Sequence, residues 1–377
     1  MGHKIRIFRC SSYSEVEGIV GDFNAISWKS LDRSPFILRD WLEGWCDAYQ
    51  EGRMPVIYVV EVDGNHPIIA PFTYNKYRIL NIPYYKLEFI NPVWPYHSFI
   101  ISDFKGAKRS IKPLMDEICN DLIGVSGLDF QGVPEDSYTK LLLDSAYCDG
   151  VKYTPHPNYP AYYLDVLKDW ELYLAGLSKK TRKGFRHAFR KARKDFNVEF
   201  IEHTEYGSLR KSYDKFIQLH QKRWKKKNVN GLFADDNYLK FHKRVAEKFN
   251  EKKILSLHFL LFDSEPIAAI NAFEFDGKVF THLHGFDPDY ADYSPGHLVI
   301  NSLIQDSIEK GMREFDMMRG NEPYKRRYKP TARVHFEYIF YKNGLQNLAH
   351  SCRVHLDFRR LNNLYNVVSD RKTLVKW

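Results

Sequence analysis

The sequence predicts an α/β protein of two related domains, each with a mixed, mostly antiparallel sheet flanked by helices. Three observations support this fold class. The chain has 377 residues, and a chain of this length usually forms more than one hydrophobic core. Pro67-Ile68-Ile69-Ala70 is echoed 199 positions later by Pro266-Ile267-Ala268-Ala269, which indicates two copies of one unit, with a chance echo as the alternative. Residues 285–330 read as strand, helix and strand.

The domain boundaries follow from the same pattern. Residues 1–160 are expected to form the first domain and residues 161–342 the second, with a helical tail over 343–377. The proline-rich residues 154–159 (TPHPNY) read as a linker before the second domain.

In the first domain, residues 35–49 are a helix candidate because Ile37, Trp41 and Trp45 fall on one face. Two β-branched runs separated by Asp-Gly-Asn predict a hairpin. Residues 91–97 are too rich in proline for a central strand and read as a loop. The aromatic segment 83–99 suggests ring faces that would contact a sugar or an extended apolar group, or would pack between the domains. Further elements are expected as hairpin strands at 56–62 and 67–74, helices at 111–122 and 138–147, and a short strand at 128–130.

In the second domain, residues 254–262 predict a strand that turns into another beginning at Pro266. Asp276-Gly277 predicts a tight turn into a third strand over 278–286. A turn through Ser294-Pro295-Gly296 then leads into an amphipathic helix, and a last strand covers 313–318.

The positive charge of this chain is concentrated in one segment. The net charge is +9, and residues 178–194 hold nine Lys or Arg and no acid; the rest of the chain has 47 basic and 47 acidic residues. Phe185, Phe189 and Ala192 recur at helical spacing, so the segment predicts an amphipathic helix with a basic outer face. That face is either a solvated surface or a site for an anionic ligand or an RNA backbone.

Five scattered cysteines without a C-x-x-C pair argue against a disulfide framework and a zinc knuckle. We interpret them as reduced, mostly buried thiols. No apolar run suits a signal peptide or a membrane-spanning helix, so a cytoplasmic protein is expected.

An ordered series of short motifs resembles a known family. It comprises 177–182 (LSKKTR), 219–224 (LHQKRW), 266–269 (PIAA), 285–288 (GFDP) with Ser294-Pro295-Gly296, and Phe315-Asp316 through Arg319-Gly320 to Tyr324-Lys325. The series is similar to the acetyltransferase domain of the CelD or BioF-like type in the GNAT superfamily. It is also similar to the Fem-type aminoacyltransferases, which carry two such folds in tandem.

The resemblance implies two neighbouring strands that splay apart, with acyl-CoA in the gap and its pyrophosphate on the amides that open the next helix. A helix N-terminus suits an anion, and Gly296 would let a phosphate approach. Of the usual signature, Gln or Arg, two residues, Gly, one residue, then Gly or Ala, only Gly296 is present. The alternative is a turn that merely starts a helix. The expected cofactor-binding residues are Ser294, Pro295, Gly296, His297, Lys325 and Arg326.

Acyl transfer to an amine needs a donor that polarises the thioester carbonyl, a base and an acid. Backbone amides over 283–285 would supply the donor. Asp287 is the candidate base, with His284 as its substitute, although Asp287 equally suits a turn cap before Pro288. Tyr324 is the candidate acid. A two-residue period would place His282 and His284 on one face, as a packed pair rather than a metal site, so no metal is expected.

His220, Arg223 and Trp224 share one helical face, as an acceptor-binding wall or as core packing. The resulting hypothesis is an N-acyltransferase that moves an acyl group, in the first instance acetyl, from acyl-CoA to an amine on a small molecule or sugar. One alternative uses aminoacyl-tRNA as donor, with the RNA on the basic helix. The other is a non-catalytic binding protein with the same fold. The sequence leaves the oligomeric state open.

Overall fold

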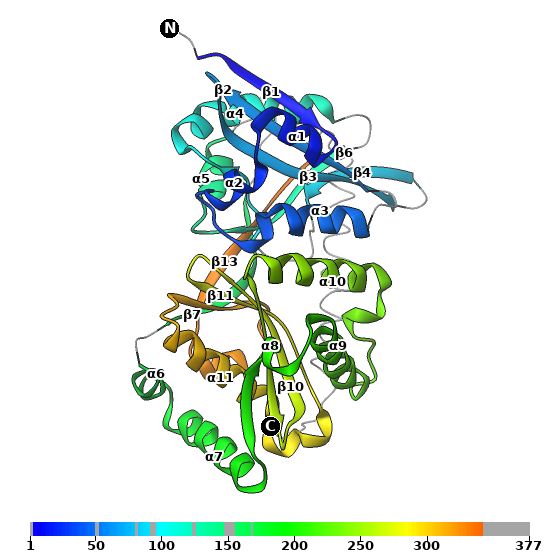
Figure 1. The fold of residues 1–377 in the computed structure, drawn as a ribbon. Coiled ribbons are helices and arrows are strands. Elements are labelled where there is room, and N and C mark those ends of the chain that lie inside the picture. Colours follow the sequence, from blue (N-terminus) through cyan, green and yellow to red (C-terminus); the bar gives the residue numbers. More distant parts are fainter. Residues whose placement is uncertain are drawn as a thin grey trace.

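The computed structural model describes residues 3–49, 53–79, 82–90, 96–122, 126–146, 155–166 and 169–341. In Figure 1 the N-terminal half lies above the C-terminal half, with helices on both sides of a central sheet. None of the described helices is long and apolar enough to span a bilayer.

Thirteen strands within the described residues belong to one sheet. Their order is β1-β2-β3-β4-β6-β13-β7-β12-β11-β10-β9-β8, with β5 on β3. The strands are β1 (Ile5–Cys10), β2 (Arg53–Val62), β3 (Asn65–Ile79), β4 (Ile82–Phe89), β5 (Ile100–Ile101), β6 (Ser126–Pro134), β7 (His156–Asp165), β8 (Val198–Glu202), β9 (Leu255–Phe262), β10 (Glu265–Phe275), β11 (Lys278–Phe286), β12 (Glu314–Arg319) and β13 (Thr331–Tyr341).

The strand order is the same when read inward from either edge, which matches the expected internal repeat. A hairpin, a third strand, a crossover helix and a parallel strand follow one another in both halves: β2-β3-β4-α4-β6 and β9-β10-β11-α11-β12. The parallel pairs are β4 with β6 and β11 with β12. The echoed Pro67 and Pro266 segments lie in β3 and β10 at equivalent positions.

The strand that follows each repeat lies on the other half of the sheet. β7 follows the first repeat but pairs with β12, and β13 follows the second repeat but pairs with β6. β7 and β13 then pair antiparallel with each other at the centre of the sheet. The expected division into residues 1–160 and 161–342 remains a prediction, because these two strands link the halves.

The hydrophobic core has three parts, each between the sheet and the helices that cover it. One face carries α1, α2, α3, α9 and α10 over a core that runs through both halves. The other face carries α4 and α5 over the N-terminal half and α7 and α11 over the C-terminal half. The helices are α1 (Tyr13–Val20), α2 (Phe23–Trp28), α3 (Arg39–Ala48), α4 (Phe104–Asp121), α5 (Tyr138–Ser145), α6 (Trp170–Gly176), α7 (Lys179–Asp195), α8 (His203–Tyr206), α9 (Leu209–Lys225), α10 (Asp236–Glu251) and α11 (Pro295–Glu309).

The two halves are joined on the first face by α3 and α10, which lie side by side in Figure 1. The helices are close at Gly44, where a Cβ atom would make an ordinary van der Waals contact with the Phe241 ring at 3.5 Å. Trp41 packs edge-on against Phe241 with ring centroids 4.9 Å apart. This aromatic contact makes the helix pair part of a single core.

Most predicted elements are confirmed, and one is wrong. Residues 156–159 belong to β7 rather than to a linker, and Pro157 lies opposite Phe336 of β13, next to an irregularity in the register of that pair. Strand β4 occupies part of the aromatic segment 83–99. Residues 91–95 of that segment, the predicted tail over 343–377, Cys148 and Cys352 lie outside the described residues. Cys10 and Cys46 are free thiols.

Candidate active site

A gap opens between two neighbouring strands of the C-terminal half. β11 and β12 pair in parallel only from Lys278 and Glu314 to Phe280 and Asp316. Beyond that point β11 continues to Phe286 beside β10, while β12 continues to Arg319 and pairs with β7 on its other edge. The resemblance implied such a splay, and the structure contains it.

The unpaired edge of β11 faces this gap. The Asp287 amide donates to the Ile267 carbonyl oxygen at 2.8 Å, which fixes the hydrogen-bond phase between β11 and β10. In an antiparallel pair, alternate residues point their N–H and C=O groups to opposite edges. The backbone groups of His284 and Phe286 therefore point away from β10 and into the gap.

Helix α9 crosses β11 closely and brings Arg223 to that edge. The Arg223 guanidinium donates to the His284 carbonyl oxygen at 3.2 Å and lies 5.2 Å from the centre of the Phe286 ring. Arg223 has no ion pair among the described residues, and its Nε has no hydrogen-bond partner there. Burial lowers the pKa of Arg223 from its usual value. A guanidinium without a carboxylate partner is suited to bind an incoming oxygen atom.

His284 and Tyr324 meet at the gap, with ring centroids 6.0 Å apart. Burial, and then the nearby Arg223 charge, hold the pKa of His284 well below its usual value, so the imidazole is neutral at neutral pH. The structure thus brings the substitute base and the candidate acid together.

His282 does not share a face with His284, so that prediction is wrong. The register of β11 on β10 shifts at Asn271 and Ala272, which leaves His282 in a bulge and breaks the two-residue alternation. His282 packs instead against Trp41 and His242, with ring centroids 5.6 and 4.9 Å away. The described residues contain no cluster of three or more His, Cys, Asp or Glu that could hold a metal ion.

Asp287 ends β11 and caps the turn that follows it. Its Oδ1 accepts a hydrogen bond from the Asp289 amide at 3.0 Å, as the turn-cap alternative expects. Its Oδ2 accepts one from the Lys222 ammonium at 2.5 Å. Both carboxylate oxygens are therefore engaged by groups that hold the turn and the end of α9.

Helix α11 begins beside the end of β11. Ser294 precedes it in the left-handed conformation (φ 55°), and the carbonyl oxygen of Ser294 accepts from the amides of His297 and Leu298. Pro295 has no N–H, so the Gly296 amide is left as the first donor without a partner among the described residues. A Cβ atom on Gly296 would lie 3.3 Å from the Phe286 ring, so this glycine also serves packing.

The three basic residues expected to bind the cofactor, His297, Lys325 and Arg326, differ in their exposure and in their contacts. His297 contacts the Tyr328 hydroxyl at 3.0 Å and Arg327 at 3.1 Å. Arg326 is exposed and donates to Asn321. Lys325 is 2% exposed, and its ammonium donates to three backbone carbonyl oxygens. Arg326 and Arg327 are accessible to a phosphate, whereas Lys325 supports the backbone.

His220 and Trp224 pack together on α9. The Trp224 indole N–H donates to His220 Nε2 at 3.1 Å, and the His220 ring packs edge-on against Phe233 at 5.0 Å. His220 is 2% exposed, and burial lowers its pKa to about 4. Of the three predicted acceptor-site residues, only Arg223 reaches the gap.

In the N-terminal half, residues of the same half fill the space between the equivalent strands, β4 and β6. β4 and β6 pair in parallel up to Glu88 and Asp129. Beyond that point the His97 amide donates to the Gly132 carbonyl oxygen at 3.0 Å, and the His97 ring stacks on Phe89 at 5.5 Å. Sequence patterns did not reveal this difference, because it depends on where one loop folds back.

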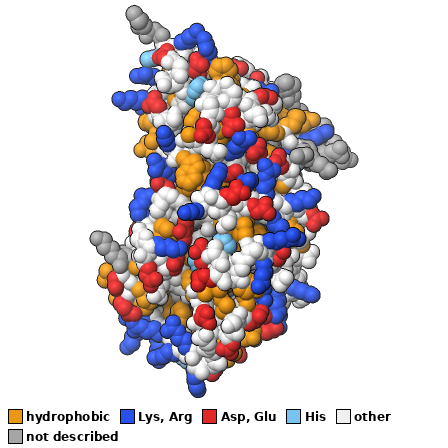
Figure 2. Space-filling view, in the orientation of Figure 1, with side chains coloured by type: hydrophobic (Ala, Val, Ile, Leu, Met, Phe, Trp, Pro, Cys, Tyr) orange, Lys and Arg blue, Asp and Glu red, His pale blue; other side chains and the backbone are white. Residues whose placement is uncertain are grey.

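Basic side chains gather over α7, at the lower end of the molecule in Figure 2. Phe185 and Ala192 are buried, as the helical spacing predicted. The exposed cations without an ion pair within the part of the chain that the structure describes are Lys179, Lys180, Lys183, Arg190, Arg193 and Lys194. The Phe185 and His297 ring centroids are 5.8 Å apart, so this surface lies next to the start of α11.

Comparison with known proteins identifies the domain that holds the gap. Residues 179–326 match the family model described as an acetyltransferase (GNAT) domain. The crystal structure of FemX has a TM-score of 0.60 at 10% identity and covers 88% of this chain and 97% of FemX. A conserved protein of unknown function from Bacteroides thetaiotaomicron has a TM-score of 0.52 at 14% identity, covering 89% of this chain and 99% of that one.

A search of curated protein sequences found no match. At these identities the two structures show a common fold only. The strand order, the gap between β11 and β12 and the family match to residues 179–326 agree with one another. Residues 179–326 of this chain are therefore a GNAT acetyltransferase domain, and the chain has the fold of FemX.

Proposed function

We propose that this protein transfers an acyl group, in the first instance acetyl, from acyl-CoA to an amine on a small molecule or sugar, in the gap between β11 and β12. The observation that supports this most strongly is the unpaired edge of β11, whose His284 and Phe286 backbone groups face the gap. An extended acyl donor would bind along this edge as an added strand does. The CelD or BioF-like type and a cytoplasmic location belong to the same proposal.

The amides of His284 and Phe286 and the guanidinium of Arg223 would polarise the thioester carbonyl. The amine nitrogen attacks the carbonyl carbon, the carbon–sulfur bond breaks, and the thiolate leaves. Donors placed where the negative oxygen forms are usually the largest contribution to such catalysis. The Gly296 amide, with Arg326 and Arg327, would bind the pyrophosphate at the start of α11, beside Ser294, Pro295 and His297.

His284 is the better placed of the two candidate bases. Its neutral imidazole lies beside Tyr324, whereas both oxygens of Asp287 already accept hydrogen bonds. His284 would take the proton from the attacking amine, and the Tyr324 hydroxyl would donate one to the leaving thiolate. Asp287 would act indirectly, by holding Lys222 and the end of α9.

The test is calorimetry with acetyl-CoA, followed by release of CoA thiol with a broad panel of amines. Binding together with amine-dependent thiol release is expected. His284→Gln and Tyr324→Phe should each lower kcat by about 100-fold, the usual size of an acid–base contribution. A protein that neither binds acyl-CoA nor releases thiol with any amine contradicts the proposal. If Asp287→Asn lowers kcat and His284→Gln does not, then Asp287 is the base.

A second candidate donor is aminoacyl-tRNA, and the exposed basic face of α7 favours it. The Fem-type transferases, which this chain resembles in fold, use that donor. Phosphate contacts make RNA binding fall steeply with salt. Co-purified tRNA that is released by salt would support this donor, and salt-insensitive or absent binding would remove it. Variants of Asp287 and Tyr324 that leave all turnover unchanged would favour a non-catalytic binding protein.

A further inference from the structure

Asp316 lies where β11 and β12 part. It is the last residue of β12 that pairs with β11, opposite Phe280, and it is fully buried. The next residue on β11, Thr281, donates its hydroxyl proton to the Asp316 carbonyl oxygen at 2.9 Å. Asp316 therefore marks the closed end of the gap.

The side chain of Asp316 also stabilises the bend that opens the gap. The register of β12 on β7 is interrupted between Asp316 and Arg319, and Met318 within this interval has φ 60°. A left-handed conformation costs a residue such as methionine roughly 1 kcal/mol or more. The Met318 amide donates to Asp316 Oδ1 at 2.6 Å, which offsets part of that cost.

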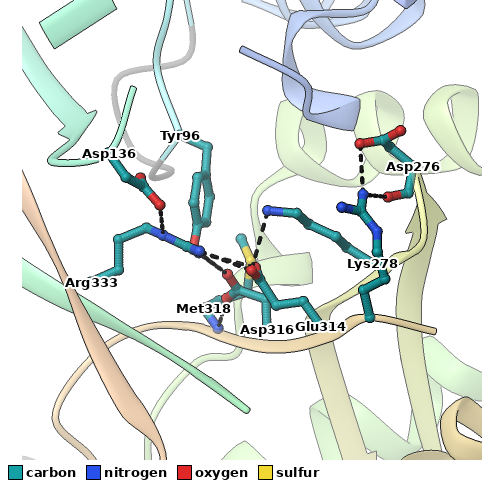
Figure 3. Close-up of polar contacts among 9 residues, drawn as sticks. Tyr96, Asp136, Asp276, Lys278, Glu314, Asp316, Met318 and Arg333 are labelled. Carbon is teal, nitrogen blue, oxygen red and sulfur yellow. Dashed lines mark hydrogen bonds and ion pairs between the residues drawn. The ribbon is translucent and has the colours of Figure 1, made fainter. Parts of the chain in front are cut away.

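The other oxygen of Asp316 is held from outside the GNAT domain, as Figure 3 shows. Tyr96, from the N-terminal half, donates its hydroxyl proton to Oδ2, and Arg333, on the exchanged strand β13, donates to it at 3.3 Å. Arg333 is itself fixed by two hydrogen bonds to Glu314, at 3.0 and 2.9 Å. All four side chains are buried, and Arg333 also donates to the exposed Asp136 carboxylate at 2.9 Å.

Lys325 holds the same bend from the other side. Its ammonium donates to the carbonyl oxygens of Met318, Arg319 and Gly320 at 3.1, 2.8 and 3.2 Å. Because Tyr324 precedes Lys325 in the chain, the position of the bend determines where the candidate acid lies. A continuous set of contacts thus runs from Tyr96 through Asp316 and Met318 to Tyr324.

We propose that Asp316 is a positioning residue for acyl transfer: held by Tyr96 and Arg333, it fixes the bend of β12 that keeps the gap open and sets Tyr324 at its edge. This inference rests on the proposed function for its catalytic consequence. It also assigns a role to the N-terminal half, whose own gap is filled, because that half supplies Tyr96.

The test compares Tyr96→Phe with a matched control, Tyr58→Phe. Tyr58 is equally buried and donates to the Asp121 carboxylate at 2.7 Å, away from the gap. Hydrogen–deuterium exchange would be followed in peptides covering 281–286 and 317–320. A lost hydrogen bond to a charged group should speed exchange there by about tenfold in Tyr96→Phe. Tyr58→Phe should leave these peptides unchanged, and equal exchange in both variants would overturn the proposal.

A second pair of variants separates the side-chain contact from general destabilisation. Asp316→Asn keeps an oxygen for the Met318 amide and should keep exchange over 317–320 within about threefold of wild type. Asp316→Ala removes that oxygen and should show the full increase. Equal behaviour of these two variants also contradicts the proposal.

The catalytic consequence is measured separately. In Tyr96→Phe, the KM for acyl-CoA should rise by about tenfold, in step with exchange over 281–286. An unchanged KM despite faster exchange would reject the positioning role. If wild-type protein binds no acyl-CoA, the proposed function fails, while the exchange results still decide whether Asp316 holds the bend.

Discussion

Gly285 lies directly against the backbone of His220: a Cβ atom on Gly285 would be 2.3 Å from the His220 nitrogen and 2.5 Å from its Cα. No side chain fits between β11 and α9 at this point. The contact is what lets Arg223, one turn further along α9, reach the His284 carbonyl oxygen at the unpaired edge of β11. A residue without a side chain thus determines where a cation lies in the gap.

Replacing Gly285 by alanine should therefore push α9 off β11. Overpacking costs typically 1–3 kcal/mol, and backbone atoms cannot yield as a side chain does, so we expect a loss of about 3 kcal/mol in the free energy of unfolding. Acyl-CoA binding should weaken with it. Denaturant melts and calorimetry measure the two effects.

The matched control is Gly184→Ala in α7, where nothing lies within 4 Å of the added Cβ. Alanine in a helix is favoured over glycine by about 0.5–1 kcal/mol, so this variant should be slightly more stable. A Gly285→Ala protein as stable as wild type would contradict the close approach of α9.

Lys325→Met tests whether this buried lysine supports the backbone or binds phosphate. The variant leaves three backbone carbonyl oxygens without their donor and Glu322 without its ion-pair partner, so the free energy of unfolding should fall by about 2–4 kcal/mol. Arg326→Ala removes an exposed side chain and should change stability by less than about 0.5 kcal/mol. If Lys325→Met is as stable as wild type and loses only donor affinity, a phosphate-binding role is favoured instead.

The sequence predicted the repeat and the site segment because both depend on local patterns. Residues 285–330 form strand, helix and strand as expected, and the Pro67 and Pro266 segments occupy equivalent strands. The spacing of Phe185 and Ala192 correctly predicted which face of α7 is buried. Turn chemistry and periodicity act over a few residues, so these signals survive without knowledge of the rest of the fold.

Features that depend on distant pairing were not predictable. The exchange of β7 and β13 joins residues about 170 positions apart, and nothing in either segment specifies its partner. One inserted residue at His282 reversed the expected face of that side chain. Asp316 was noted only as part of a motif, because its role comes from Tyr96, 220 positions away.

Acid should destabilise this protein below about pH 6.5, the unfolded-state pKa of histidine. Burial lowers the pKa of His220 and His258 to about 4 and that of His282 to about 3. The unfolded chain therefore binds more protons than the folded one between these values and 6.5. Stability is fully present above 6.5 and is lost as pH falls, by roughly 1.4 kcal/mol per pH unit for each such histidine.

Urea denaturation from pH 7.5 to pH 5 measures this slope, and His282→Leu isolates one contribution. The variant should reduce the slope by roughly 1.4 kcal/mol per pH unit below pH 6, whatever its stability at pH 7.5. A slope identical to that of wild type would show that His282 is not held neutral by burial.

The basic face of α7 gives the last prediction. Lys180 and Lys183 are exposed, lie one turn apart and have no ion pair among the described residues. Changing both to glutamate should leave the melting temperature unchanged but abolish RNA retention if tRNA carries the acyl group. In a plot of the logarithm of the RNA-binding constant against the logarithm of the salt concentration, the magnitude of the slope should fall by roughly 2 for the two lost phosphate contacts.

The control changes Lys105 and Lys108 to glutamate; these two lysines are equally exposed and equally spaced on α4. An equal loss in that control would indicate non-specific attraction and remove α7 as an RNA site.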